Sequence, residues 1–372
     1  MKYLDEFRNS VLAQHLVRAI RRSCTRRWTI MEVCGGQTHG LLRYGIEEEL
    51  QNVVELVHGP GCPVCVTPRE AIDLACRLAL EPKVLLASFG DMLRVPGSRE
   101  SLQAIAAAGG NVQPVYSPAD AVDLARRNPR RDVVFFAVGF ETTAPATALA
   151  ILQAEQLGLT NFSLLVSHVR VQPAMEAIAE DPVSRVEGFL AAGHVCTVAG
   201  CESYKSFVMR HGLPVVVTGF EPLDLLQGIR ACIRQLEAGT AAVVNQYARS
   251  VLPQGNLAAQ QIVERVYEVC DRPWRGLGVI PAGGLRLREE WARFDAEQRY
   301  GRQFADAEEC SDCRSGDVLS GRIKPPECPH FATLCNPDNP LGAPMVSSEG
   351  ACAAYYRYRR QPLALRLEGA GA

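Results

Sequence analysis

Short apolar runs alternate with helical stretches along most of this sequence, and this alternation restricts its fold more than any other feature. Most of the runs are apolar throughout rather than at every second position. Continuous apolar runs are typical of parallel strands that are covered by helices on both faces. The sequence therefore predicts an α/β fold. We expect eight strands, over residues 28–33, 53–57, 83–88, 112–116, 132–138, 162–167, 194–199 and 213–218.

Helix start signals follow several of these runs. Pro68 opens a helical stretch directly after Thr67, and Pro118 opens another after Ser117. Proline is favoured in the first turn of a helix, and a preceding Ser or Thr can cap it. A further amphipathic helix is expected over about residues 4–22.

The tripeptide Gly-Phe-Glu occurs twice, at residues 139–141 and 219–221, each time between an expected strand and an expected helix. The two glutamates could cap these helices or belong to a site. A chain of 372 residues is too long for one ordinary core. We therefore expect two similar Rossmann-like parallel-sheet domains and a small irregular C-terminal region. The expected boundaries are 1–135, 136–270 and 271–372.

The charge balance excludes two classes of partner. With 39 basic and 41 acidic residues, the chain has no electrostatic footprint for nucleic acid or for an anionic membrane. It also lacks an N-terminal apolar signal and any apolar run of about 18–20 residues, so we expect a cytoplasmic protein. The 14 cysteines are many for a compartment where disulfides are rare, which indicates that some of them carry chemistry.

Cys34 follows the first expected strand, in the stretch MEVCGGQTHG. In open parallel sheets, sites form at the carboxyl ends of strands. A helix that begins near Gln37 would lower the pKa of this thiol through its dipole and free amides. His39 could reach a metal at Cys34 or simply lie on the helix, whereas His194 is expected to be structural.

The next expected strand leads to GPGCPVC, which brings Cys62 and Cys65 to the same edge as Cys34. Three interpretations of this pair stay open: a redox dithiol, two ligands of a shared metal, or two small residues in a turn. The glycines lack the pattern of a dinucleotide fingerprint, and no Walker A lysine is present. We expect neither NAD nor ATP to bind.

The C-terminal region holds a second group of cysteines, and its many prolines exclude long helices. A set of four thiolates is typical of a 4Fe-4S cluster or a structural zinc ion, and the spacing fits no zinc-ribbon pattern. His330 could be an alternative ligand, although we expect a surface imidazole, and Glu349 could orient the last ligand. The expected ligands are Cys313, Cys328, Cys335 and Cys352, with Cys310 as an alternative to Cys313.

Several stretches together resemble the hydrogenase maturation protein D (HypD) family. They are CGGQTHG (34–40), GPGCPVC (59–65), GFETTAP (139–145), PVVVTGFEP (214–222) and MVSSEGAC (345–352). The resemblance implies a scaffold on which iron acquires cyanide and carbon monoxide for the Fe(CN)2CO moiety of nickel-iron hydrogenases. It implies an assembly scaffold with redox activity rather than a turnover enzyme.

The resemblance also implies roles for single residues. Cys34 would bind iron together with a cysteine of the small chaperone HypC, and HypE would deliver cyanide. Cys62 and Cys65 would be the redox-active pair, and the tail cysteines would hold the 4Fe-4S cluster, with Cys313 favoured over Cys310. Many relatives have a cysteine where this chain has Pro344. The rival interpretation is an iron-sulfur dependent protein disulfide reductase that uses the same residues.

Overall fold

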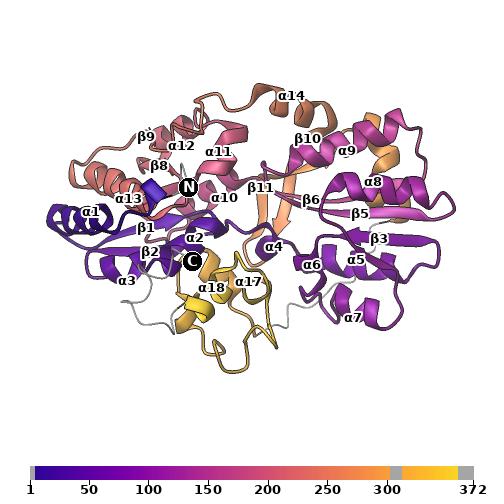
Figure 1. Cartoon of the computed structure of the whole chain (residues 1–372), viewed down its shortest axis with the longest axis horizontal. Coiled ribbons are helices and arrows are strands. Elements are labelled where there is room, and N and C mark those ends of the chain that lie inside the picture. Colours follow the sequence, from indigo (N-terminus) through magenta and orange to yellow (C-terminus); the bar gives the residue numbers. More distant parts are fainter. Residues whose placement is uncertain (1–4, 302–311, 359–372) are drawn as a thin grey trace.

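The computed structural model describes residues 5–301 and 312–358 of the chain (Figure 1). The described strands are β1 (Trp28–Glu32), β2 (Val54–His58), β3 (Val84–Ser88), β4 (Val112–Pro114), β5 (Asp132–Gly139), β6 (Phe162–His168), β7 (Gly188–Ala192), β8 (Val215–Thr218), β9 (Val243–Asn245), β10 (Tyr267–Trp274) and β11 (Gly278–Leu287).

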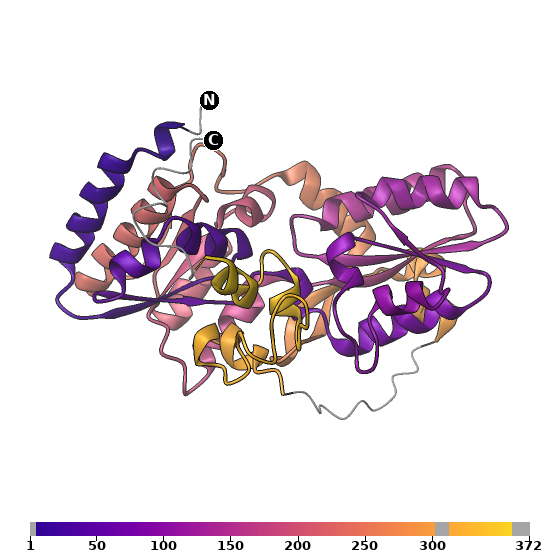
Figure 2. The ribbon, with the colours of Figure 1, turned by 60° about the horizontal axis from the view of Figure 1, so that its bottom comes forward.

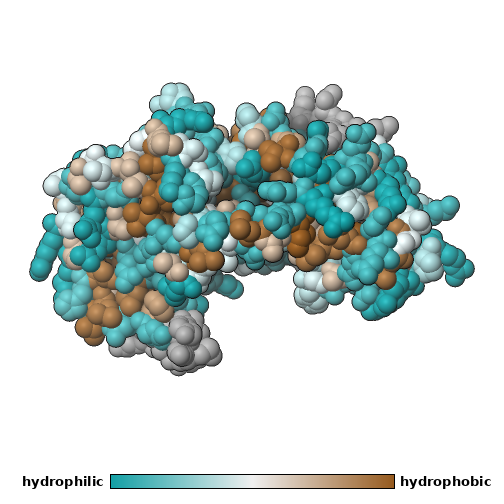
Figure 3. Space-filling view, turned by 90° about the horizontal axis from the view of Figure 1, so that it is seen from above, coloured by the Kyte–Doolittle hydropathy of each residue, from teal (hydrophilic) through white to brown (hydrophobic). Residues whose placement is uncertain are grey.

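Two parallel sheets form the frame of the molecule. Sheet A has the strand order β2-β1-β7-β8-β9, and sheet B has the order β4-β3-β5-β6. Strands β10 and β11 pair with each other as an antiparallel hairpin. Figure 1 places sheet A on the left and sheet B on the right, and the outline of the molecule narrows between them in Figure 3. The expected α/β class with parallel sheets is confirmed.

Helices cover both faces of each sheet. The α-helices are α1 (Ser10–Ser23), α2 (Gly35–Arg43), α3 (Ile46–Leu50), α4 (Pro63–Val66), α5 (Arg69–Leu80), α6 (Gly90–Leu93), α7 (Leu102–Ala107), α8 (Pro118–Arg127), α9 (Ala144–Gln156), α10 (Val171–Glu180), α11 (Gly193–Ala199), α12 (Tyr204–His211), α13 (Pro222–Glu237), α14 (Leu257–Val266), α15 (Ala296–Tyr300), α16 (Ser315–Leu319), α17 (Ala343–Val346) and α18 (Ala351–Tyr358). Short 3-10 turns are η1 (Asp5–Phe7), η2 (Glu289–Phe294) and η3 (Pro325–Glu327). Residues from α1, α2 and α13 pack on one face of sheet A, and residues from α10, α11 and α12 pack on the other.

The strands of the two sheets interleave along the chain. The expected boundary at residues 135/136 falls inside β5, and β1 and β2 lie in one sheet with β7, β8 and β9. The chain therefore leaves sheet A after β2, builds all of sheet B, and returns to sheet A. Sequence periodicity identifies strands but not the sheet to which each belongs, which is why this grouping was not expected.

One expected strand is wrong. Residues 194–199 form most of α11, and the neighbouring strand is β7, Gly188–Ala192, which the sequence did not indicate. A run of four to six apolar residues can form either a buried strand or a buried turn of helix, and periodicity alone does not separate the two.

The expected helix starts are close to those observed. Ser117 accepts a hydrogen bond from the Asp120 amide and completes a capping box at α8. At α5 the cap position is Pro68, and the Thr67 hydroxyl donates to the Pro63 carbonyl instead. The first helix is shorter than expected and begins at Ser10, where Asn9 caps it.

The C-terminal segment of the described chain lies between the two sheets, beside α2 and α4 (Figures 1 and 2). It contains only short helices, as its prolines require. Among the described residues, no helix is both long and apolar enough to cross a membrane.

Candidate metal and redox site

Cys34 lies at the carboxyl end of β1, as expected, and is the N-cap residue of α2. Its side chain is only 1% exposed. The Cys34 amide donates a 2.7 Å hydrogen bond to the carboxylate of Glu32, the last residue of β1. The strand end and the helix start therefore hold this thiol in one defined position.

Cys62 and Cys65 belong to the turn after β2, the strand next to β1. They form a disulfide across α4, with their Cα atoms 5.2 Å apart, and both are buried. Gly61 presses against the backbone of Cys34, where a Cβ on this glycine would lie 2.1 Å from the Cys34 nitrogen. Gly61 is therefore required for the two turns to meet. The three cysteines lie in one buried cluster, as the strand order predicted.

The two glycines after Cys34 admit bulky neighbours. A Cβ on Gly35 would lie 2.5 Å from the Cβ of Glu349, and one on Gly36 would lie 3.2 Å from the ring of Phe220. Glu349 therefore lies over the start of α2, rather than serving only as a support for Cys352. Residues without a Cβ at these two positions allow this close packing.

His194 is the residue that the sequence argument undervalued. Its Nδ1 atom lies 3.7 Å from the Cys34 sulfur, and its ring stacks on Phe220 with the ring centroids 5.2 Å apart. The imidazole is exposed whereas the thiol is buried, so His194 stands between Cys34 and solvent. Because its segment was expected to be a strand, its place at the first turn of α11 could not be foreseen.

The expected lowering of the Cys34 pKa is wrong. Burial raises the pKa of this thiol well above its usual range, and the nearby Glu32 carboxylate raises it further. Amides at the start of α2 act in the opposite direction but do not compensate. A raised pKa favours the neutral thiol over the thiolate at Cys34.

His39 points to a different neighbour. Its Nε2 atom lies 2.8 Å from the hydroxyl of Tyr358, and the two rings meet edge to face. This contact joins α2 to α18. A metal role for His39 stays a prediction, because no contact between His39 and Cys34 is seen in the described structure.

A buried network of charged groups begins at Glu32, and it was not predicted from the sequence. Glu32 accepts hydrogen bonds from the Thr38 hydroxyl and, at 2.7 Å, from His58 Nδ1. On its other side His58 faces Glu47 at 3.4 Å, and Glu47 pairs with Lys324. A signal was present, because Glu32 and His58 end neighbouring strands and are direct register partners.

The same network reaches the C-terminal segment. The hydroxyl of Tyr355, on α18, donates to Glu47 at 2.5 Å and lies 3.3 Å from His58 Nε2. Burial alone would lower the pKa of His58, but the hydrogen bonds to Glu32 and Glu47 outweigh it and raise that pKa to about 9. The Cys34 strand is thus tied to α18, the helix that carries Cys352.

The four expected cluster ligands in the tail influence one another electrostatically. Burial raises the pKa of Cys352 well above its usual range, and the charges of the three other thiols raise it further. The Cys335 sulfur accepts a hydrogen bond from the Leu341 amide at 3.4 Å, and a Cβ on Gly342 would lie 2.2 Å from the Cys313 sulfur. Across residues 5–301 and 312–358, no set of three or more His, Cys, Asp or Glu side chains is arranged as a metal site. Cys310 lies outside the described residues.

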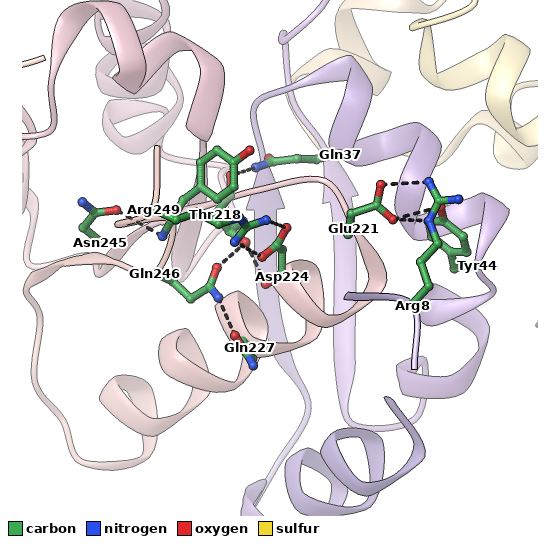
Figure 4. Close-up of polar contacts among 11 residues, drawn as sticks. Arg8, Gln37, Tyr44, Thr218, Glu221, Asp224, Gln227, Asn245, Gln246 and Arg249 are labelled. Carbon is green, nitrogen blue, oxygen red and sulfur yellow. Dashed lines mark hydrogen bonds and ion pairs between the residues drawn. The ribbon is translucent and has the colours of Figure 1, made fainter. Parts of the chain in front are cut away.

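A set of polar contacts joins α2, β8 and the start of α13 (Figure 4). Asp224 is fully buried and forms two hydrogen bonds, of 2.7 and 2.6 Å, with Arg249. Gln37 donates to the carbonyls of Ala191 and Thr218, which joins α2 to β7 and β8.

Neither Gly-Phe-Glu glutamate caps its own helix. Glu221 forms an ion pair with Arg8, whereas Glu141 accepts a hydrogen bond from the Val171 amide at the start of α10.

Comparison with known proteins assigns the chain to a family. The family model described as "HypD: Hydrogenase formation hypA family" matches residues 11–359. The chain belongs to the HypD family. It is 48% identical to the hydrogenase maturation factor HypD of Azotobacter vinelandii, over 97% of this chain and 98% of that protein. It is 47% identical to HypD of Rhodobacter capsulatus (96% and 98% covered) and 44% identical to HypD of Escherichia coli K12 (97% and 99% covered).

Membership in the HypD family is consistent with a role in hydrogenase maturation. The family and the many cysteines of this chain are also compatible with binding of an iron-sulfur centre. The resemblance that the sequence motifs indicated is therefore confirmed at the level of the family.

Proposed function

We propose that this protein is the scaffold on which the Fe(CN)2CO moiety of nickel-iron hydrogenases is assembled, with Cys34 as the thiolate that binds the iron. The observation that carries the proposal is the position of Cys34. It is a buried thiol between an exposed imidazole and Glu349, directly beside the Cys62–Cys65 disulfide. Soft thiolate and imidazole ligands suit iron that carries strong-field ligands.

Iron ligands that are shared between this protein and a partner would explain why Cys34 is shielded from solvent. A thiol that is 1% exposed cannot take up free iron without movement of its neighbours. His194 is an exposed neighbour of the sulfur, so we propose that its displacement opens a way to Cys34. We propose that the small chaperone HypC contributes a second thiolate on this side, and that HypE delivers cyanide to the same place.

We propose that the tail cysteines hold a resident 4Fe-4S cluster. Cys313, Cys328, Cys335 and Cys352 form an all-sulfur donor set whose charges act on one another, which is the ligand set such clusters take. A cluster held there supplies one-electron chemistry when it is bound. Pro344 and the glycine at 342 shape the wall beside Cys313.

Cys62 and Cys65 are proposed as the redox pair. Opening their disulfide takes two electrons and two protons and yields two thiols beside Cys34. The rival function, a protein disulfide reductase, needs a partner disulfide to reach these sulfurs. Both residues are buried, at 3% and 0% exposure, which argues against that rival.

The test compares two single-cysteine variants of the protein copurified anaerobically with its small partner. Cys34→Ala should lose the iron that exceeds the cluster content, together with the infrared bands of bound cyanide and carbon monoxide. The absorption spectrum of the cluster should persist. Cys76→Ala removes another buried cysteine, on α5, and should keep both signals.

Full iron loading of the Cys34→Ala variant would refute the assignment. Zinc without iron in the wild-type protein would instead support a structural zinc site in the tail. Localisation in the cytoplasm stays a proposal. Cell fractionation, with the protein detected in each fraction by antibody, tests it.

A further inference from the structure

A cavity of about 660 Å³, which Cys34 does not line, lies where four elements meet. Its walls come from the start of α5, from α10, from the turn between β10 and β11, and from α16. One side is apolar and includes Ile178, Trp274 and Leu277. The cavity is large enough for a small molecule.

Two arginines in this cavity lack the partners that charged groups usually have. Arg275 is only 7% exposed, and its Nη2 atom donates to the Pro96 carbonyl at 3.0 Å. Its Nη1 atom is buried and has no hydrogen-bond partner among the described residues. Within residues 5–301 and 312–358, no ion pair or hydrogen bond joins the Arg69 side chain to another residue. A buried cationic donor without a partner is costly unless a ligand satisfies it.

The other charges in the cavity are mostly compensated. Arg314 pairs with Asp317, and Arg322 pairs with Asp181. The remaining acid on the wall is Glu70. Burial and then the like charge of Arg69 lower the pKa of Arg275 to about 10, whereas Cys313, Glu70 and Asp73 act in the opposite direction.

The helix that begins at this wall adds further donors. Helix α5 spans 12 residues, and its N-cap residue, Pro68, makes no side-chain capping bond. The first amides of a helix lack intrahelical partners and carry a partial positive charge, which favours an anion there. Two arginines and an uncapped helix start therefore converge on one wall.

We infer that this cavity binds a small molecule that carries a carboxylate or phosphate group. The anionic group lies against Arg69, Arg275 and the first amides of α5, and the body of the molecule lies on the apolar wall. Arginine suits both groups, because its planar donors match their paired oxygens.

The cavity contacts parts of the chain that carry the proposed redox groups. The Arg275 amide donates to the Val66 carbonyl, one residue after Cys65, and Cys313 lines the same cavity. The occupant thus lies between the disulfide turn and the tail cysteines. The inference does not depend on Cys34 or on any bound metal.

Isothermal titration calorimetry of the full-length protein tests the inference, with sodium phosphate and sodium malonate as separate probes at constant ionic strength. We expect one saturable site for at least one of them. Arg69→Gln should weaken binding about tenfold, because it removes a charge-assisted contact. Glu70→Gln should strengthen binding, because it removes the facing negative charge.

The matched control is Arg77→Gln on the same helix, since Arg77 bonds to the Gly301 carbonyl, and it should leave the affinity unchanged. Tighter binding of phosphate or of malonate assigns the natural ligand to phosphates or to carboxylates. Absence of saturable binding of both probes overturns the inference, as does equal affinity in wild type and Arg69→Gln. Arg275→Lys, checked for folding by circular dichroism, provides a second test at the buried position.

Discussion

Replacing His58 should remove a specific dependence of stability on pH. His58 is 2% exposed and lies between the carboxylates of Glu32 and Glu47. Its pKa in the folded protein is about 9, compared with 6.5 for an unperturbed histidine. The folded state therefore binds this proton more tightly than the unfolded state does.

The size and the sign of the effect follow from linkage. A rise in pKa from 6.5 to about 9 corresponds to about 3 kcal/mol of stability. Because the folded-state pKa is raised, this contribution is fully present below pH 6.5 and is lost as the pH rises through about 9. The free energy of unfolding of the wild-type protein should thus fall by about 3 kcal/mol from this group between pH 6 and pH 10.

Urea unfolding followed by circular dichroism, at a series of pH values, measures the effect. The difference in free energy of unfolding between wild type and His58→Gln should shrink by about 3 kcal/mol over that range. His39→Gln is the matched control. The pKa of His39 is lowered, by burial and then by Arg43, so its contribution makes stability rise with pH rather than fall.

Parallel curves of the free energy of unfolding against pH for wild type and His58→Gln would refute the reasoning. So would a direct titration of the His58 ring by nuclear magnetic resonance with a midpoint below about pH 7. The second measurement uses the wild-type protein and does not require the variant to fold.

Three further substitutions test the packing around the site. Gly61→Ala should destabilise the protein by a few kcal/mol, because its Cβ would meet the Cys34 backbone at 2.1 Å. The control Gly90→Ala meets nothing within 4 Å and should be nearly neutral. Thermal unfolding of the two variants measures the difference in stability. Asp224→Asn should cost about 1.5–3 kcal/mol by weakening the charge-assisted hydrogen bonds to Arg249, which is itself exposed to solvent, and a loss below about 1 kcal/mol in urea unfolding would contradict this. Ser117→Ala should cost about 1 kcal/mol through loss of the α8 cap, which the urea midpoint detects.

The sequence predicted the parts of the site that depend on neighbouring strands. Cys34 and the Cys62–Cys65 turn follow two consecutive strands that pair in parallel, so their meeting follows from local patterns. The fold class followed from the same apolar runs. The grouping of β1 and β2 with β7 depends instead on contacts between segments far apart in the chain, which no local pattern encodes.

The parts that were missed have physical causes. His194 was placed in a strand because a short apolar run does not distinguish strand from helix. The lowered pKa expected for Cys34 considered the helix start but not burial, which is the larger effect. Lys324 and Tyr355 reach Glu47 from the far end of the chain, so their pairing could not be read from spacing.

The return of the chain to sheet A has a consequence for synthesis. Gln37 bonds to Ala191, 154 residues later, and β1 pairs directly with β7. At translation rates of about 5–20 residues per second, roughly ten to thirty seconds separate the emergence of Cys34 from the ribosome and the arrival of the strand that encloses it. During that interval the thiol is not yet buried, so Cys34 of the nascent chain is more accessible to oxidants and to free metal ions than Cys34 of the folded protein.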